Sequence, residues 1–285
     1  MRLGQNPNKN TVVQPRARVV VLVITHLPSV EGYHAGRFDV VKRSFETLIT
    51  NMGGLDHQLI VWDNGSSDLL IEWLVKHGIH KFVLSENVGK TNALKSIMRM
   101  LPPDTILAYG DDDIEYFPNW LAPQIEILET YPNVGVVTGW PVRIASKWGE
   151  KSVEKLFGDA WGKPKVQINS PFGNWLIETG RFIPDEWERD YCESVGRNYT
   201  EYAMSTNLLA DTRITYKGIQ TYATSQHCQF VCYPSRVERM IQWTDKAMAP
   251  EIDFDKAVDA AGLLRLSTVE RYARHMGNVL ERGKT

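Results

Sequence analysis

The chain has 285 residues, of which 43% are hydrophobic and 23% are charged, and these proportions are typical of a globular protein with a full core. Lys and Arg number 32 against 34 Asp and Glu, so the formal net charge of −2 gives no reason to expect nucleic acid as a partner. Three cysteines argue against a disulfide framework and fit a reducing compartment.

No stretch reaches the ~18 uninterrupted apolar residues that a membrane span needs. Residues 1–14 are polar and hold no apolar signal core. We therefore expect a cytoplasmic protein, which can still contact a membrane surface peripherally. The sequence does not decide the oligomeric state.

The first 140 residues alternate between short apolar runs and amphipathic segments. Buried strands are predicted at residues 18–25, 57–62, 81–84, 105–110 and 133–138, where apolar and β-branched residues run together. Helices are predicted at residues 38–52, 69–77, 89–101 and about 119–130, where apolar side chains recur on one face. This order predicts an α/β fold with a mostly parallel central sheet and helices on both faces.

The pattern changes after Gly139. Tryptophans stand among Gly, Pro, Lys and Ser residues, which predicts a loop-rich region with short strands near residues 175–177 and 215–223. Residues 254–281 are predicted to form one or two terminal helices. We divide the chain into a flexible tail (1–16), an α/β half (17–140), a second half of the same domain (141–235) and a C-terminal helical segment (236–285).

Three consecutive aspartates, Asp111, Asp112 and Asp113, follow the predicted strand at residues 105–110. Their mutual repulsion costs free energy unless a cation shares them. Hard oxygen ligands of this kind suit Mg²⁺ or Mn²⁺, and ligands of parallel sheets bind outside the carboxyl ends of the strands. The alternative is a solvated acidic turn before the next helix.

Two other predicted strands also end in polar residues. Residues 63–68, Asp-Asn-Gly-Ser-Ser-Asp, combine a tight turn with an acidic residue where a base or ribose would sit, although a plain strand-to-helix turn explains Gly65 and Ser67. Asn87 to Lys90 follow the next strand. Gly89-Lys90-Thr91 is not a P-loop, because Leu84 stands where that motif needs a glycine. A lysine beside a helix start can bind an anion or can simply be solvated.

Together these motifs resemble the inverting GT-A glycosyltransferases of the family-2 type. That pattern has a first strand leading to Thr or Asn, then D-D/N-G-S-x-D, N-x-G-x-x-x-A-x-N and a metal-binding D-x-D. The chain shows Thr25, residues 63–68, residues 87–95 and residues 111–113 in this order, so the resemblance covers about residues 19–140. It departs from the pattern at Lys95-Ser96, where a polar-glycine pair is expected, and at Gly110, where an aspartate often precedes the pair.

The resemblance implies a hexosyltransferase of GT-A fold that uses Mn²⁺ or Mg²⁺. The donor would be a UDP- or GDP-linked sugar, and the acceptor a hydroxyl of a glycan, a lipid-linked sugar or a small molecule. Residues 17–140 would bind the donor and residues 141–235 the acceptor. The residues implied to bind the donor are Thr25, Asp63, Asn64, Asn87, Gly89, Lys90, Asp111 and Asp112. The residues implied to bind the metal are Asp113, Asp111 and a C-terminal histidine, for which His227 is the candidate.

The catalytic base is expected in the acidic stretch of residues 180–191. Asp190 fits the family best by its offset, with Glu188 as the second candidate. Asp185, Glu186 and Glu193 stay open as alternatives. Acidic residues in the first turn of a helix are also favoured by the helix dipole alone.

Two other functions are considered. A sugar-phosphate nucleotidyltransferase would carry a Gly-rich basic loop after the first strand, whereas residues 25–29 here are Thr-His-Leu-Pro-Ser. A nucleotide- or glycan-binding module without catalysis is the other alternative, and the intact aspartates argue against it.

Overall fold

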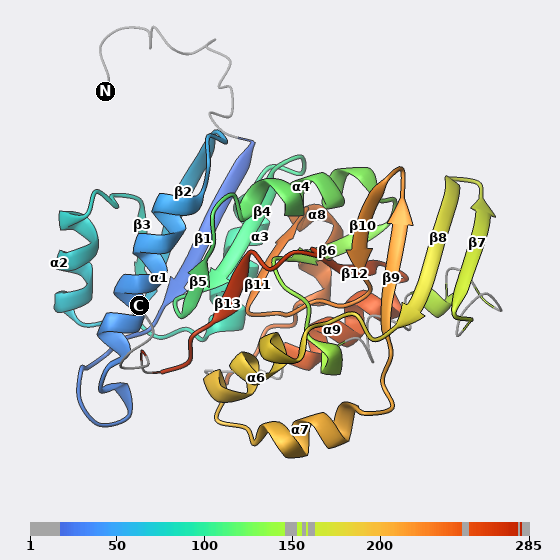
Figure 1. Cartoon of the computed structure of the whole chain (residues 1–285). Helices are drawn as coiled ribbons and strands as arrows, with labels where there is room; N and C mark the ends of the chain where they lie inside the picture. Colours follow the sequence, from blue (N-terminus) through green and yellow to red (C-terminus); the bar gives the residue numbers. More distant parts are fainter. Residues whose placement is uncertain are drawn as a thin grey trace, which may run out of the picture.

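The computed structural model describes residues 18–145, 153–155, 158, 163–246, 251–278 and 280. The strands of its main sheet are β1 (Val19–Thr25), β2 (His57–Asn64), β3 (Phe82–Ser85), β4 (Ile106–Asp111), β6 (Val134–Thr138), β7 (Lys165–Ser170), β8 (Gly173–Gly180), β9 (Asp211–Tyr216), β10 (Ile219–Tyr222), β11 (Gln229–Cys232) and β12 (Leu264–Ser267). Within the described residues they form one eleven-stranded sheet in the order β3-β2-β1-β4-β11-β6-β12-β10-β9-β8-β7 (Figure 1).

The first four strands are parallel, and their carboxyl ends lie at one edge of the sheet. In the register, Thr25 of β1 lies opposite Asp63 of β2, and Ile24 lies opposite Asp111 of β4. Strand β11 then runs antiparallel to both β4 and β6, so the sheet is mixed. The predicted α/β fold is confirmed, and the polar strand ends meet as expected.

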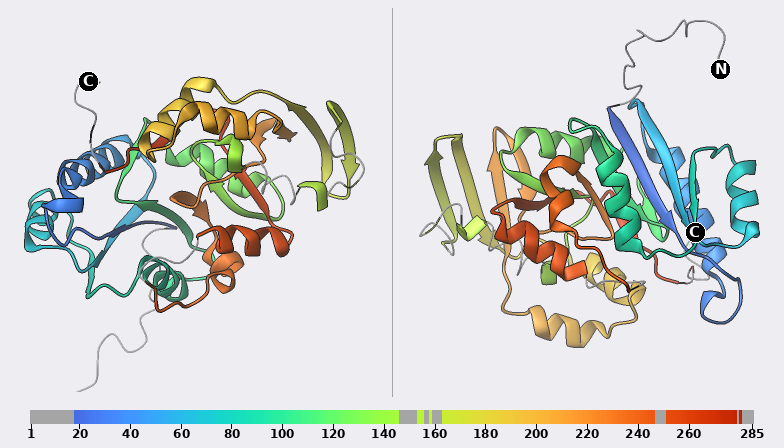
Figure 2. Two further views of the ribbon diagram at one scale, coloured as in Figure 1. Left: turned by 90° about the horizontal axis from the view of Figure 1, so that it is seen from below. Right: turned by 180° about the vertical axis from the view of Figure 1, so that it is seen from behind.

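Helices cover both faces of the sheet (Figure 2). One face carries α1 (Arg37–Asn51), α2 (Asp68–Lys76) and α4 (Leu121–Thr130), whose apolar side chains join one core cluster. The other face carries α3 (Lys90–Met100), α8 (Pro234–Val237) and α9 (Glu251–Ala260), which share a second cluster. Helices α6 (Asp185–Ser194) and α7 (Tyr199–Thr206) lie at the lower edge in Figure 1, and the short 3-10 turns are η1 (Gly32–His34) and η3 (Glu238–Met240).

The predicted strands and helices of residues 18–138 are all present within a few residues of their predicted ends. Near residues 215–223, where the sequence predicts strand, the chain forms the hairpin of β9 and β10. Lys217 and Gly218 turn the chain there with φ of 49° and 83°. Strand β11 was not predicted.

The prediction of helices across residues 254–281 is wrong beyond Ala260. Gly262, with a φ of 74°, follows α9, and the chain then forms β12 beside β6 and β13 (Ala273–His275) beside β5 (Ile114–Tyr116). A short apolar run such as Leu264–Ser267 does not distinguish a buried strand from a buried helix. Arg265 of β12 is fully buried and forms ion pairs with Asp255 and Asp259, which attaches α9 to the sheet.

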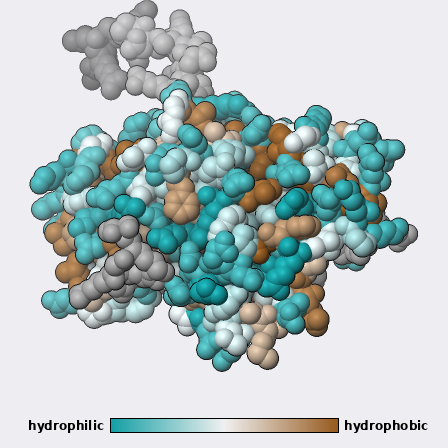
Figure 3. All heavy atoms as spheres, in the orientation of Figure 1, coloured by the Kyte–Doolittle hydropathy of each residue, from teal (hydrophilic) through white to brown (hydrophobic). Residues whose placement is uncertain are grey.

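Among the described residues, none of the helices combines the length and the apolar character needed to span a bilayer. The face shown in Figure 3 is mostly hydrophilic, with hydrophobic residues in smaller groups.

Candidate functional site

The carboxyl ends of β1 and β2 are joined through their side chains. The Thr25 hydroxyl donates a hydrogen bond of 3.1 Å to Oδ1 of Asp63. The backbone N–H of Ser66 also donates to this carboxylate, at 3.2 Å to Oδ2. Thr25 and Asp63 are both buried, at 0% and 5% exposure. The turn after β2 therefore holds the Asp63 carboxylate at the sheet edge.

An amide network links β2 to the loop before α3. Nδ2 of Asn64 donates to Oδ1 of Asn87 at 3.0 Å, and Oδ1 of Asn64 accepts from the N–H of Val88 at 2.8 Å. Gly89 donates its N–H to Asn87 at 3.0 Å and has a φ of 85°, a conformation that favours glycine. These contacts fix the loop that leads to the N-terminus of α3.

The carboxylate of Asp111 is held between two side chains. Nζ of Lys90 lies 2.7 Å from Oδ2, and the hydroxyl of Tyr109 donates to Oδ1. The preceding residue is Gly110, and a Cβ atom there would collide with the hydroxyl of Tyr116. Packing against Tyr116 therefore explains the glycine that departs from the family pattern.

Asp112 and Asp113 share the guanidinium group of Arg37 at the start of α1. Nη1 of Arg37 lies 3.0 Å from Oδ2 of Asp113, and Nη2 forms an ion pair with Asp112. The N–H of His26 also donates to Asp112, at 3.3 Å, and Nε2 of His275 lies 3.3 Å from Oδ2 of Asp113. Side chains of the protein itself, Arg37 and His275, thus contact the carboxylates of Asp112 and Asp113.

These contacts shift the pKa values in opposite directions. Burial raises the pKa of Asp112 above the usual value, although Arg37 opposes the shift. Burial would also raise the pKa of Asp113, but His275 and Arg37 together lower it. Burial lowers the pKa of His275, and the nearby Asp113 outweighs this effect, so the net pKa is raised. Two adjacent carboxyl groups therefore have unlike proton affinities.

The aspartates carry oxygen atoms of the kind that a hard metal ion binds. Oδ1 of Asp113 is buried and has no hydrogen-bond partner among the described residues. No three His, Cys, Asp or Glu side chains are grouped closely enough, in the described part of the chain, to hold an ion on their own. Mg²⁺ commonly takes one or two carboxylates and completes its coordination with substrate phosphates and water. Asp111 and Asp113 carry carboxylates of the kind that arrangement uses.

Helix α6 lies beside the aspartates through strand β13. Nδ1 of His275 lies 3.2 Å from the hydroxyl oxygen of Ser194, at the end of α6. One helical turn earlier, Asp190 forms an ion pair of 2.9 Å with Arg271, and its side chain is 32% exposed. Asp190 is therefore partly exposed to solvent. Its helix also contacts His275, the partner of Asp113.

Comparison with known proteins identifies the family. The sequence pattern described as "Glycosyl transferase family 2" matches residues 33–183, which is 151 of the 285 residues. The chain belongs to this family. The resemblance noted in the sequence is thus confirmed. No curated protein matches the chain.

Two solved structures are similar to parts of this family-2 chain. The mannosyltransferase PcManGT from Pyrobaculum calidifontis, in complex with GDP-Man and Mn²⁺, is 21% identical, with a TM-score of 0.34, over 46% of this chain and 37% of that one. GalNAc-T7 with UDP, GalNAc and Mn²⁺ is 10% identical, with a TM-score of 0.44, over 92% of this chain and 45% of that one. The chain thus spans less than half the length of either structure.

One predicted site residue lies elsewhere than expected. His227 was expected beside Asp113, but its Nδ1 atom lies 3.3 Å from Asp255 of α9. The histidine beside Asp113 is His275, which the sequence analysis missed because β13 was predicted as helix. Only the pairing of β13 with β5, directly after the aspartates, brings it there.

Glu188, the second candidate for the base, is 1% exposed. It forms an ion pair with Arg143, which also binds Asp211 at 3.1 Å, and it accepts a hydrogen bond of 3.2 Å from the Tyr202 hydroxyl. Burial raises the pKa of Glu188, and Arg143 opposes the shift. Glu188 is enclosed and paired, so it is not accessible to an acceptor. The open alternatives Asp185, Glu186 and Glu193 are all exposed.

Proposed function

We propose that this glycosyltransferase moves a sugar from a nucleotide diphosphate sugar to an acceptor hydroxyl, with inversion at the anomeric carbon and with the help of Mn²⁺ or Mg²⁺. One observation supports this proposal above all. The polar groups at the ends of β1 to β4 lie side by side on one sheet edge, in contact through Thr25–Asp63, Asn64–Asn87 and Lys90–Asp111. Ligands of parallel sheets bind at such an edge.

In this proposal Asp63, Asn64 and Asn87 bind the base and ribose. Asn64 and Asn87 already bond to each other, which orients both amides before the nucleotide arrives. Lys90 begins α3, so its ammonium group and the first N–H groups of that helix carry positive charge on the same side. A diphosphate bound there would compete with Asp111 for Lys90.

The proposed metal position is between Asp111 and Asp113. The Oδ1 atom of Asp113 supports it, because this buried oxygen has no hydrogen-bond partner in the described part of the chain, and a buried carboxylate oxygen without a partner costs free energy. When bound, such an ion would neutralise the charge of the leaving diphosphate. Arg37 and His275 keep Asp113 ionised, as its lowered pKa indicates, and thus hold it ready as a ligand.

Asp190 is the proposed base. The acceptor oxygen attacks the anomeric carbon, the bond from that carbon to the diphosphate breaks, and the acceptor proton passes to the Asp190 carboxylate. The nucleoside diphosphate leaves with the bonding electron pair. The 2.9 Å ion pair with Arg271 orients the Asp190 carboxylate, and its partial exposure lets an acceptor reach it.

A screen of UDP- and GDP-linked sugars with Mn²⁺ or Mg²⁺ tests the proposal, with release of nucleoside diphosphate as the readout. Asp190→Asn should lose turnover by roughly 100-fold or more and should keep the donor affinity. The matched control is Glu186→Gln on the same helix, which should change turnover much less.

The anomeric configuration of the product, read by NMR, decides the stereochemistry. Retention of configuration would contradict inversion. Near wild-type turnover of Asp190→Asn would move the base to another carboxylate.

A further inference from the structure

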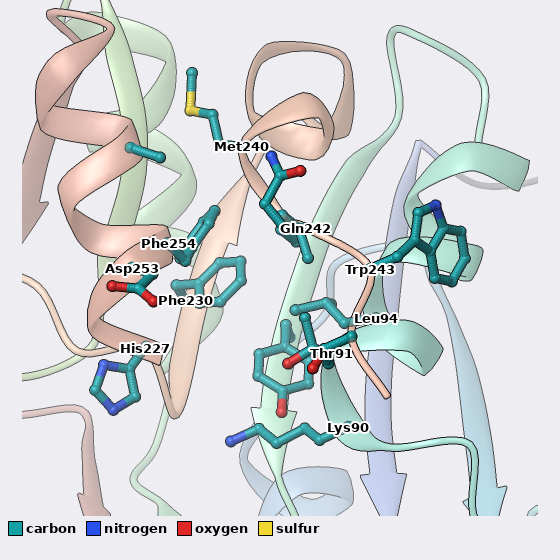
Figure 4. Close-up of a pocket in the computed structure, with 14 residues that line it drawn as sticks. Lys90, Thr91, Leu94, His227, Phe230, Met240, Gln242, Trp243, Asp253 and Phe254 are labelled. Carbon is teal, nitrogen blue, oxygen red and sulfur yellow. The ribbon is translucent and has the colours of Figure 1, made fainter. Parts of the chain in front are cut away.

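A cavity of about 290 Å³ lies on the α3 face of the sheet (Figure 4). Helices α3 and α9 form two of its walls, strands β4 and β11 form its floor, and the segment 240–244 covers it. Its lining is largely apolar and aromatic and includes Leu94, Tyr109, Phe230, Ile241 and Phe254. A cavity with these walls favours a hydrocarbon or aromatic ligand.

One end of this cavity touches the proposed donor site. Side chains alternate between the faces of a strand, so Tyr109 and Asp111 of β4 point to the same face. The Tyr109 hydroxyl and Nζ of Lys90 both contact the Asp111 carboxylate, and both residues also line the cavity. A ligand in the cavity would therefore place its polar end beside Asp111.

Two of the proposed donor-binding residues, Thr25 and Asp63, lie on the opposite face. Thr25 continues the row of Val19, Val21 and Val23 along β1, and these valines belong to the core on the α1 side. Tyr109 belongs to the other core cluster. Donor groups held by Thr25 and its neighbour Asp63 would thus lie across the sheet edge from the cavity. Asn64, two residues after Trp62 of the cavity-side cluster, lies on the same face as the cavity.

The cover of the cavity is held by specific contacts. Nδ2 of Asn92 donates to the carbonyl of Thr244 at 2.7 Å, and the N–H of Thr244 donates to Oδ1 of Asn92 at 3.1 Å. The ring of Phe230 on the floor stacks with the ring of Phe254 on the α9 wall, with their centres 5.6 Å apart. These contacts make the cavity a preformed site, and preformed sites bind with a lower ordering cost.

We propose that this cavity binds the apolar part of the acceptor, a hydrocarbon chain or aromatic group that carries the reacting hydroxyl at its Asp111 end. The inference rests on the proposed function, since it names the acceptor class of the same site. A cavity of roughly 150 Å³ holds one benzene molecule, so this one has room for about two groups of that size.

Straight-chain primary alcohols test the inference directly. Binding of butan-1-ol, hexan-1-ol and octan-1-ol to the full chain is measured by calorimetry. Affinity should rise about threefold to fourfold for each added methylene. Ala257→Phe places a ring in the cavity and should abolish this rise. Ala260→Phe makes the same change at an exposed position of α9 and should preserve it.

A second measurement does not depend on any variant. In the wild-type protein, NMR cross-relaxation should connect the terminal methyl group of octan-1-ol with the ring protons of Phe230 and Phe254. With the donor found in the screen, added octan-1-ol should also raise the rate of nucleotide release above the rate of donor hydrolysis without alcohol. This rise should occur in wild type and Ala260→Phe, but not in Ala257→Phe.

Binding of UDP and GDP to the same proteins separates the outcomes. Equal nucleotide binding by both variants supports the inference. Nucleotide binding lost only in Ala257→Phe would overturn it, because the cavity would then hold the base. Nucleotide binding without any rise of alcohol affinity with chain length overturns the inference and leaves the proposed function standing. Absence of nucleotide binding in wild type refutes the proposed function itself.

Discussion

Arg37 is expected to stabilise the apo protein through the aspartates, and Arg37→Gln tests this. The Arg37, Asp112 and Asp113 side chains are only 13%, 7% and 11% exposed. A neutral glutamine side chain in place of Arg37 would leave two buried carboxylates with much less positive charge beside them. Removal of one partner from a buried ion pair typically costs 3–5 kcal/mol, so we expect about 3 kcal/mol of unfolding free energy to be lost near pH 8.

The loss should depend on pH in a defined direction. Burial already raises the pKa of Asp112, and Arg37 is the main group that opposes it. Without Arg37, Asp112 can relieve the cost by binding a proton at low pH. Urea unfolding of wild type and Arg37→Gln in EDTA should therefore show a smaller difference at pH 6 than at pH 8.

Arg181→Gln is the matched control. Its ion pair with Asp185 is exposed on both sides, at 48% and 56%, and should contribute about 0.5 kcal/mol or less. If Mn²⁺ binds the aspartates, it should stabilise both proteins, because both keep Asp111 and Asp113, and it should narrow the difference between them by replacing part of the charge lost with Arg37. If Arg37→Gln is no less stable than Arg181→Gln at pH 8, Arg37 does not stabilise the buried aspartates.

Three further substitutions test neighbouring contacts. Asp63→Ala should weaken nucleotide binding by roughly 1–3 kcal/mol, measured by calorimetry, because it removes a buried hydrogen-bonding group; an unchanged affinity would place Asp63 outside the site. The raised pKa of His275, caused by Asp113 against burial, means that its charge adds stability below pH ~6.5, and that this stability is lost as the pH rises through the folded-state pKa. The stability difference between wild type and His275→Gln in EDTA should therefore shrink from pH 6 to pH 9, and a difference that grows would contradict the assignment. Glu188→Gln should lower the free energy of unfolding in urea by about 1–3 kcal/mol, since it weakens a buried ion pair. Asp190→Asn should change it by about 0.5 kcal/mol or less. The reverse order would make Asp190 the structural carboxylate and Glu188 the free one.

The donor side of the site could be predicted because each of its motifs is local in sequence. Asp63, Asn87 and Asp111 each follow a strand that its own apolar run reveals, and parallel pairing then brings the strand ends together. The sequence did not reveal in this way which basic side chains neutralise the aspartates. Arg37 reaches Asp113 across 76 positions of sequence, and nothing in its local pattern distinguishes it from a solvated arginine at a helix start.

The acceptor side depends on contacts that no local pattern encodes. His275 reaches Asp113 only because β13 pairs with β5, and residues 273–275 have too few positions to show a strand period. Glu188 and Asp190 are two positions apart in one acidic helix, so their side chains point in different directions and only one is buried. The partner that decides this is Arg143, which lies 45 residues from Glu188.

The buried arginines also explain why the C-terminal segment was predicted as helix. A charged residue inside a run such as Leu-Leu-Arg-Leu normally indicates the exposed face of an amphipathic helix. Arg265 is instead buried because Asp255 and Asp259 lie beside it on α9. These ion pairs allow a sequence that contains an arginine to form the buried strand β12.

The central claim is that Asp113 and its neighbours form the donor edge of a metal-assisted glycosyltransferase. The most direct test is nucleoside diphosphate release from the best donor of the screen by wild type and Asp113→Asn, each with Mn²⁺ and with EDTA. The Mn²⁺-dependent rate of Asp113→Asn should fall at least ~100-fold, with near-normal folding. Mn²⁺-dependent release at the wild-type rate by a folded Asp113→Asn protein would contradict the central claim.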